Sequence, residues 1–381
     1  MSTLLTIFIS VFVFGFLIFI HELGHYLTAR LFKVTINEFS VGMGPRLLWY
    51  DSKKTGIRYS LAIIPIGGFV AMAGEDGIDE SAEDANDYGS PDTPREGQIN
   101  RPSVKDDPNA FCRKPAWQRF IITAAGATVN IVAGFLAMLV LVGITKIGGT
   151  EVAAFIPEQS FIDAGYDITL DDRSEAQGLK IGDVITHING KRVLIADELS
   201  YEIMRFGHEP IDITLIRGGE EVVLEDVVLP RAEQQGQTFG IMDFQVYAIQ
   251  KDFGSFFSIS LRKTVLVIRM CWESIIDLVT GRYTLAAVSG PVGISGAIGE
   301  AAKAGIASLL NITVLISINL GFMNLLPIPA LDGGRLLTIL VEMITRKKLP
   351  PRIEAAINGV GLMLLLLLSV IIMIKDVVGL F

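Results

Sequence analysis

Cysteine and histidine are scarce in this chain of 381 residues, which contains two cysteines and four histidines. Cys112 and Cys271 are too few for a disulfide framework, and neither belongs to a cysteine-based metal motif. Basic stripes are also lacking, so we expect no nucleic-acid partner. Because charge of either sign is absent from several long apolar segments, a wholly soluble protein is not expected either.

Four segments contain no Asp, Glu, Lys or Arg. They are Leu4–Ile20, Phe120–Thr145, Ile306–Leu331 and Ala355–Ile374. A helix of about 20 apolar residues crosses a bilayer, so the sequence predicts four transmembrane helices in contact with the lipid bilayer. The first segment lacks the basic start and the small-residue cleavage site of a signal peptide, and we expect it to be retained.

Basic residues flank the spans unevenly. If the spans alternate in direction, all of these basic residues lie on one side of the membrane. They are Arg30, Lys33, Arg113, Lys114, Arg119, Arg346, Lys347, Lys348 and Arg352. The positive-inside rule makes that side the cytoplasm. Both chain ends and residues 147–300 are then expected on the outer side.

Negative charge is concentrated in one loop between the first two spans. Residues 75–107 hold eleven acidic and three basic side chains, a net charge of −8 out of −9 for the whole chain. With few apolar residues to bury, the segment 75–112 is predicted to be a disordered cytoplasmic loop.

The remaining segments differ in their periodicity. Residues 34–74 are rich in β-formers and contain Pro65, which predicts a β-hairpin that dips toward the membrane. Residues 147–232 alternate and include the turn at Asn189-Gly190, which indicates a small β-rich domain. Residues 233–300 contain an amphipathic stretch, which fits either a helix on the membrane surface or one packed on the outer domain.

A candidate catalytic motif, His21-Glu22-Leu23-Gly24-His25, follows the first apolar segment. Two histidines four residues apart share one face of a helix and can bind one metal ion, while the adjacent Glu22 can act as general base. Ionisable groups within a membrane span are usually functional. The preceding apolar helix covers roughly 25 Å, which places the motif near the cytoplasmic end of the span.

A catalytic zinc ion takes three protein ligands and leaves one open position. His187 and His208 lie in the outer region, so Asp332 is the best candidate for the third ligand. It follows Pro327 and Pro329, which break the third span and redirect the chain.

The pairing of HELGH with Asn324-Leu-Leu-Pro-Ile-Pro-Ala-Leu-Asp-Gly-Gly334 resembles the site-2 protease family of intramembrane zinc metalloproteases. The stretch Gly178–Gly190 resembles a PDZ domain, and the chain as a whole is similar to the bacterial RseP type with one such domain. Shorter matches are Ile64–Gly68, Ala124–Gly126 with Asn130, Ser289–Pro291 and Asn319–Gly321.

This resemblance implies Zn²⁺ bound by His21, His25 and Asp332, with Glu22 as base. It further implies that Asn319 and Asn324 contact the substrate or help to position the reacting groups. It also implies a multi-pass protein of the bacterial inner (cytoplasmic) membrane. The expected substrates are transmembrane segments of single-span proteins, such as anti-sigma factors or remnant signal peptides, with peptide C-termini as possible ligands of the PDZ-like domain.

A substrate helix must unwind before it is cut, and an exposed strand edge at Gly67, Gly68 and Phe69 would capture the unwound segment by β-addition. Two other functions fit parts of the sequence. An inactive membrane scaffold with a PDZ domain would have no use for Glu22, and an ion or solute transporter would share the polar spans.

The expected fold is therefore an α-helical membrane protein with four transmembrane helices, a membrane-associated β-sheet between the first two, and a small β-rich PDZ-like domain between the second and third. The expected boundaries are 1–33, 34–74, 75–112, 113–146, 147–232, 233–300, 301–345 (the third span with the LDG motif) and 346–381.

Overall fold

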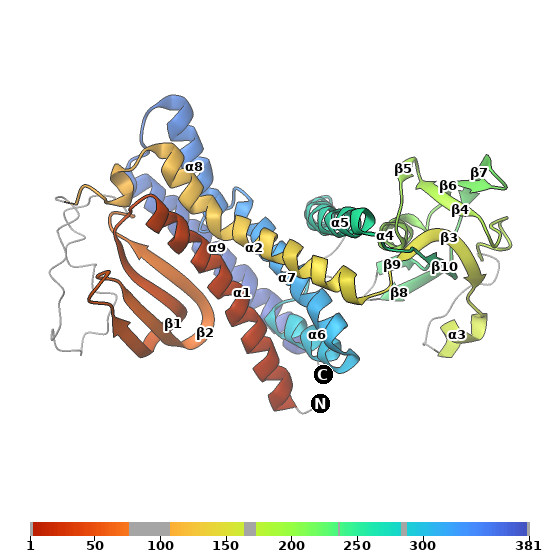
Figure 1. Ribbon diagram of the computed structural model, residues 1–381, viewed down its shortest axis with the longest axis horizontal. Helices are drawn as coiled ribbons and strands as arrows, with labels where there is room; N and C mark the ends of the chain where they lie inside the picture. Colours follow the sequence, from red (N-terminus) through yellow and green to blue (C-terminus); the bar gives the residue numbers. More distant parts are fainter. Residues whose placement is uncertain (1–2, 76–106, 164–172, 235–236, 283–287, 379–381) are drawn as a thin grey trace. The chain divides into compact units, whose positions relative to one another are not determined.

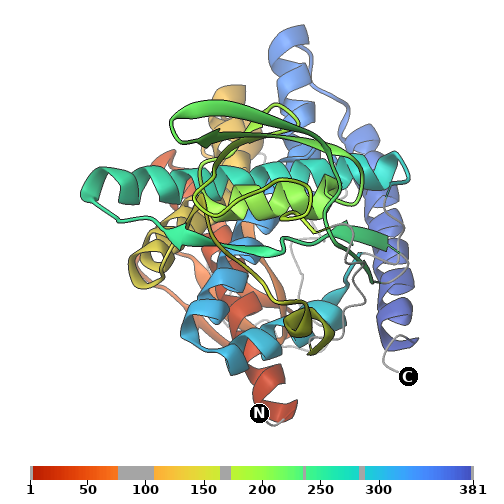
Figure 2. The same cartoon turned by 90° about the vertical axis from the view of Figure 1, so that its right-hand side faces the viewer.

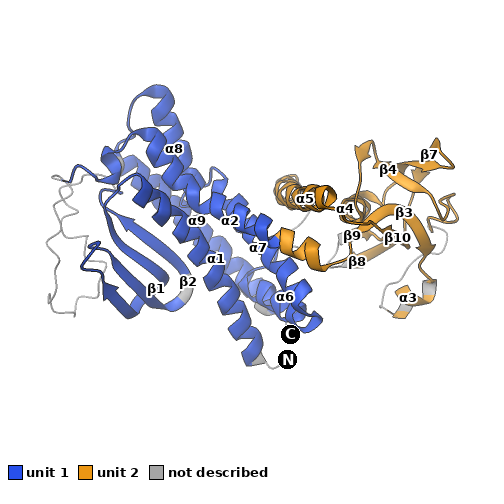
Figure 3. Cartoon of the chain, in the orientation of Figure 1, with its two compact units in different colours: residues 1–137, 288–381 blue, residues 138–287 orange. Residues whose placement is uncertain are grey.

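The computed structural model describes residues 3–75, 107–163, 173–234, 237–282 and 288–378. Most of the acidic loop expected at 75–112 lies outside these residues. The chain divides into two compact units, one formed by Met1–Ala137 with Val288–Phe381 and the other by Met138–Ala287 (Figure 3).

Within the described residues, four helices are long enough and apolar enough to cross a membrane, and they coincide with the four predicted apolar segments. They are α1 (Thr3–Leu31), α2 (Ala116–Ile144), α7 (Ile306–Leu325) and α9 (Pro351–Val378). Large apolar side chains on these helices face outward, such as Phe8 on α1 and Met363 on α9. Exposed side chains of this kind suit a lipid environment, because hydrocarbon does not penalise them.

The segment predicted as the third span, 301–345, is divided into separate helices. Helix α6 (Pro291–Ala304) ends at Gly305, α7 follows, and the chain turns after Leu325 before α8 (Asp332–Thr345) begins. The turn contains both prolines of the motif, and a Cβ at Gly333 would overlap the carbonyl of Leu326. Proline and glycine therefore place an acidic residue at the first position of a new helix.

Beside α1, strands β1 (Ile36–Asp51) and β2 (Arg58–Met72) form an antiparallel sheet that packs against the helix (Figure 1). Both strands bend. The first half of β1 pairs with Gly68–Met72 on one side and with Arg58–Leu61 on the other, and its second half pairs with 58–62. In the second half, Leu47, Leu48, Trp49 and Tyr50 are all more than half exposed. Neighbouring residues point to opposite faces of a strand, so this end of the sheet is apolar on both faces.

The second unit is built on an antiparallel sheet in the order β10-β3-β4-β6-β7, with β5 paired to β4. Its main strands are β3 (Gly148–Phe155), β4 (Val184–Ile188), β5 (Lys191–Arg192), β6 (Ile211–Arg217), β7 (Glu220–Val227) and β10 (Phe244–Ala248). Smaller elements are α3 (Glu158–Asp163), α4 (Ala196–Phe206), β8 (Arg231–Gln234) and β9 (Gln237–Gly240). Because β10 pairs with β3, the sheet continues past residue 232, where we expected this domain to end.

Helix α5 (Phe253–Val279) runs beside α4 within this unit (Figure 2). Arg205 of α4 is paired with Glu273 and Asp277 of α5, and the Tyr201 hydroxyl donates to Glu273 at 2.8 Å. Burial and this hydrogen bond raise the pKa of Tyr201. The opposite face of α5 is apolar and exposed. It carries Phe253, Phe257, Leu261, Val265, Trp272 and Ile276.

Candidate metal centre

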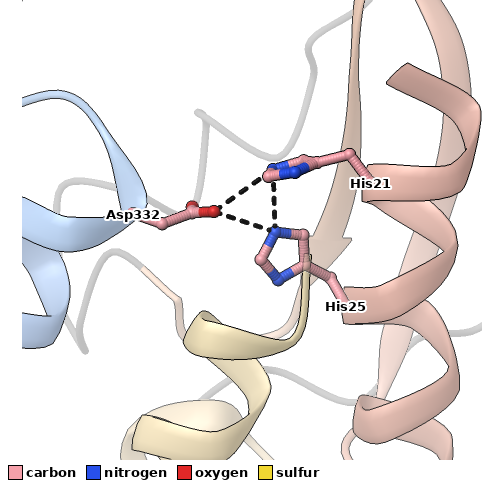
Figure 4. A group of neighbouring side chains, drawn as sticks. All are labelled: His21, His25 and Asp332. Atoms are coloured by element: carbon pink, nitrogen blue, oxygen red, sulfur yellow. Dashed lines mark hydrogen bonds and ion pairs between the residues drawn. The ribbon is translucent and has the colours of Figure 1, made fainter. Parts of the chain in front are cut away.

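Two histidines of α1 and one aspartate of α8 converge on a single point (Figure 4). The Nε2 atoms of His21 and His25 are 3.3 Å apart, one helical turn from each other. Asp332 Oδ2 lies 3.2 Å from His21 Nε2 and 3.3 Å from His25 Nε2. Both histidines are buried. Three residues that sequence analysis grouped as ligands therefore come together, although 307 positions separate the second from the third.

The orientation of His25 is fixed by α2. His25 Nδ1 donates a hydrogen bond to the carbonyl oxygen of Ile122 at 2.8 Å, so in the neutral ring Nε2 carries a lone pair that points at Asp332. A Cβ at Gly126 would overlap the His25 ring, and one at Gly24 would lie 2.6 Å from the Ala125 carbonyl oxygen. These two glycines let α1 and α2 approach closely enough to make the hydrogen bond.

The site contains more acceptors than donors. The bare Nε2 of neutral His25 and the carboxylate oxygen of Asp332 both offer lone pairs, and Asp332 Oδ2 is buried without a hydrogen-bond partner among the described residues. Facing acceptors repel unless a cation lies between them. The three ligand atoms all lie within 4.8 Å of one another, close enough to share one ion. Two imidazoles and one carboxylate are the donor set of a catalytic zinc site, so the residues present fit that metal.

Glu22 lies beside this centre. It is within electrostatic range of His25, His21 and Asp332. Its side chain touches β2, because a Cβ at Gly68 would lie 2.9 Å from Glu22 Cγ. The residue expected to act as base is thus next to both the metal ligands and the strand expected to hold substrate.

The strand residues singled out from the sequence lie in β2. Gly68 and Phe69 pair with Val41 and Ser40 of β1, and no strand among the described residues pairs with their other edge. Gly67 has φ of +91°, a conformation that disfavours other residues, and a Cβ there would lie 2.7 Å from Met43 Sδ.

Asn319 and Asn324 lie on α7, before the proline turn. Asn319 is exposed and Asn324 is half-buried. Among the residues that the structure describes, neither amide is hydrogen-bonded to the two histidines or to Asp332. The structure therefore does not bring these two residues into the cluster of ligands.

Two features near the site were given no role from the sequence. Asn130 of α2 is completely buried, with Nδ2 3.4 Å from His21 Nδ1. Arg335, one turn after Asp332, is paired with Glu75 at the end of β2 and lies over the Phe111 ring at 5.3 Å. Phe111 begins the short helix η2 (Phe111–Arg113) that leads into α2. A single amide in an apolar span is a signal that could have pointed to Asn130.

Comparisons with known proteins agree with this geometry. The model of the family described as Peptidase family M50 matches residues 9–368. A Clostridium acetobutylicum protein named as a zinc metalloprotease is 32% identical, over 97% of this chain and 96% of its own length. The zinc metalloprotease RasP of Geobacillus kaustophilus is 30% identical over 99% and 98%, and the regulator of sigma-W protease RasP of Bacillus subtilis is 29% identical over 99% of both chains.

Proposed function

This chain belongs to Peptidase family M50 and is an intramembrane zinc metalloprotease, and on that premise we propose that His21, His25 and Asp332 hold the zinc ion while Glu22 acts as general base. The observation that carries the assignment is the meeting of facing acceptor atoms, His25 Nε2 and Asp332 Oδ2, at 3.3 Å. A metal ion shared by the two atoms makes that arrangement favourable for a neutral imidazole.

The chemistry follows from the positions of these side chains. A zinc ion supplies a Lewis acid that activates water and polarises the scissile carbonyl. Glu22 takes the proton of the attacking water and returns it to the leaving amine. The Ile122 carbonyl holds the His25 ring with Nε2 directed at the other proposed ligands.

Glu22→Gln tests the base without removing a ligand. Proteolysis of a labelled single-span protein in liposomes should fall about 100-fold to 10,000-fold, while zinc content stays at the wild-type level. Glu300→Gln, on the exposed side of α6, is the matched control and should cleave normally. Unchanged turnover by Glu22→Gln would contradict the base role.

The ligand assignment has a separate test. Asp332→Ala and His21→Ala should each lose tightly bound zinc, measured by metal analysis after dialysis. Wild-type levels of zinc in either variant would contradict the proposed site. A wild-type protein that binds zinc, cleaves nothing and carries solute in an uptake assay would favour the transporter, and one with neither activity would favour the scaffold.

For substrate delivery, we propose that an unwound segment adds to the free edge of β2 at Gly67, Gly68 and Phe69, beside Glu22. A model substrate with N-methylated amides next to the scissile bond would lose the hydrogen bonds of strand addition. Its KM should rise at least about tenfold, whereas N-methylation of amides about two helical turns from the scissile bond should have no effect. Equal KM values would contradict the proposal.

Asn319 and Asn324 are proposed to contact the substrate rather than the ligands, because both lie on α7 ahead of the turn that leads to Asp332. Amides there can donate to substrate carbonyls. Asn→Ala at either position should lower kcat/KM and leave zinc content unchanged. Loss of zinc in either variant would contradict a role confined to substrate.

As substrates we propose transmembrane segments of single-span proteins. The support is the name of the Bacillus subtilis relative, a regulator of sigma-W protease, which fits substrates that control a sigma factor, such as anti-sigma factors. Remnant signal peptides present the same chemistry. Membrane proteins that accumulate on the Glu22→Gln variant and disappear with the wild type would identify the substrate. Accumulation of soluble proteins alone would contradict the proposal.

We propose a bacterial inner-membrane location with the metal centre near the cytoplasmic face and the second unit outside. The basic residues at the ends of the spans support it. In a background without Cys112 and Cys271, single cysteines at Lys347 and at Glu220 should react with an impermeant maleimide on opposite sides of oriented vesicles. Labelling of both from one side would contradict this topology.

Two exposed apolar surfaces are proposed to enter the bilayer interface, the Leu47–Tyr50 end of the sheet and the outer face of α5. The start of α5 is held at the end of the second span, since Lys251 Nζ donates to the carbonyls of Val142 and Thr145 at 2.6 Å each. Proteins retaining only Trp49 or only Trp272 should be quenched by brominated lipids. A tryptophan that is not quenched would remove its surface from the proposal.

We also propose that the sheet of the second unit is a PDZ-like domain. The Gly178–Gly190 run falls on the turn before β4, on β4 and on the turn after it. Peptides with free C-termini should bind the full-length protein more tightly than the same peptides with amidated ends. Equal binding of the two forms would contradict C-terminal recognition.

A further inference from the structure

Asn130 occupies a position on α2 that faces the metal centre. It follows Ile122 and Gly126 at intervals of four residues, so the three lie on one face of the helix. Ile122 and Gly126 of this face contact His25, and Asn130 contacts His21. The Asn130 side chain is completely buried in an otherwise apolar span. A polar group buried at membrane depth is retained when it has a partner to serve.

The side-chain amide of Asn130 has a polar neighbour at only one of its two ends. Its main-chain oxygen accepts a hydrogen bond from Ser317 Oγ of α7 at 2.8 Å, a contact that does not involve the side-chain amide. Nδ2 lies 3.4 Å from His21 Nδ1. The other end of the amide, Oδ1, is buried and has no hydrogen-bond partner among the described residues.

His21, the histidine that faces this amide, requires a hydrogen-bond acceptor at Nδ1 when it binds a metal ion. If His21 Nε2 binds a metal ion, its only proton is on Nδ1, which must then donate a hydrogen bond. In His25 the equivalent Nδ1 donates its hydrogen bond to the Ile122 carbonyl. Near His21 Nδ1 the matching acceptor is Asn130 Oδ1, brought there by a half-turn of the amide about its Cβ–Cγ bond.

We propose that Asn130 is a positioning residue for His21: its Oδ1 accepts a hydrogen bond from His21 Nδ1 and thereby fixes the ring with Nε2 directed at the metal position. This inference rests on the proposed zinc site. In this arrangement one face of α2 orients both histidines of α1, through a main-chain carbonyl for one ring and a side-chain amide for the other.

Three variants of the full-length protein test the proposal by zinc affinity, measured in detergent by competition with a chelator. Asn130→Leu keeps the volume and removes hydrogen bonding, and it should weaken zinc binding about 10-fold to 100-fold. Asn130→Asp retains an acceptor oxygen and should recover most of the lost affinity. Ser317→Ala is the matched control. It disturbs packing at the same residue without touching the amide, so zinc affinity should stay within about twofold.

The outcomes separate the possibilities. Wild-type affinity in Asn130→Leu, or an equal loss in Ser317→Ala, would overturn the positioning role. If Asn130→Asp does not fold, Asn130→Ser replaces it as the acceptor variant, and affinity no better than that of Asn130→Leu would also overturn the role. A wild-type protein that binds no zinc would overturn the metal site and this inference together, whereas normal wild-type binding with an unaffected Asn130→Leu would overturn only the inference.

Discussion

Both compact units bury ionisable side chains, but the neighbours of these groups differ. In the second unit Arg205 lies against Glu273 and Asp277, so positive charge meets negative charge directly. In the first unit Asp332 Oδ2 faces two imidazole nitrogens and has no hydrogen-bond partner among the described residues. Paired charges hold one element against another, whereas converging acceptors form a place for a cation. The comparison therefore separates a structural network from the proposed metal site, and it can be tested in both units.

The largest effect is expected from breaking the charge network. Arg205→Ala leaves Asp277 buried without a partner, which should cost about 3–5 kcal/mol in the free energy of separating α5 from α4. Amide hydrogen exchange of α5 measures this free energy, and zinc content should not change. Arg262→Ala is the control, because its contact with Glu198 is long, at 3.5 Å, and the Arg262 side chain is partly exposed, so the pair contributes at most about 1 kcal/mol. Loss of zinc in Arg205→Ala would contradict a purely structural network.

Gly126→Ala tests the first unit, and it adds a group beside the proposed metal centre instead of removing one. The new methyl group would overlap the His25 ring, and a misplaced ligand of this kind should lower kcat/KM about 100-fold together with zinc affinity. Gly143→Ala, on the same helix, meets only Phe256 at 3.7 Å and should behave as wild type. Equal activity of the two variants would show that α2 does not constrain the histidine.

A smaller effect is expected at Arg335. It ties the start of α8 to Glu75, so Arg335→Ala should loosen Asp332 and reduce kcat/KM by about tenfold. Lys347→Ala, just beyond the same helix, is exposed and serves as control. An unchanged rate in Arg335→Ala would show that the α7–α8 turn alone positions Asp332.

The smallest effect concerns the thiol of Cys271 on α5. Burial raises its pKa to about 11 from a usual value of 9.0, so less thiolate is present at any given pH below that. In a Cys112→Ser background the rate of alkylation should rise roughly ninefold between pH 9 and 10, against roughly twofold for an ordinary thiol. A twofold rise would show that α5 is not packed as described.

Much of the fold follows from local sequence. The four uncharged segments predicted four apolar helices, and the described part of the chain contains a long apolar helix at each of them. Pro327 and Pro329 predicted the break that separates α7 from α8. Patterns of this kind act within one segment, and helix length and proline sterics decide them without help from the rest of the chain.

The amphipathic stretch left two interpretations, and local pattern could not choose between them. The structure shows that the charged face of α5 packs on α4 while the apolar face is exposed. Periodicity reports that a helix has two faces, but it does not say which neighbour each face meets. The sheet boundary near residue 232 was missed for a related reason, because the partner of β10 is β3, almost a hundred residues earlier.

The sequence by itself determined which side chains are available to the proposed metal site: His21 and His25 on one helical face, the adjacent Glu22, and Asp332 after the proline break. Tertiary structure alone decided how these groups are held. The carbonyl of Ile122, the gap left by Gly126 and the amide of Asn130 come from a different helix. Residue type and spacing along one helix fix which ligands are offered, but the orientation of a ring depends on what lies across the helix interface, and that is settled only when the helices pack.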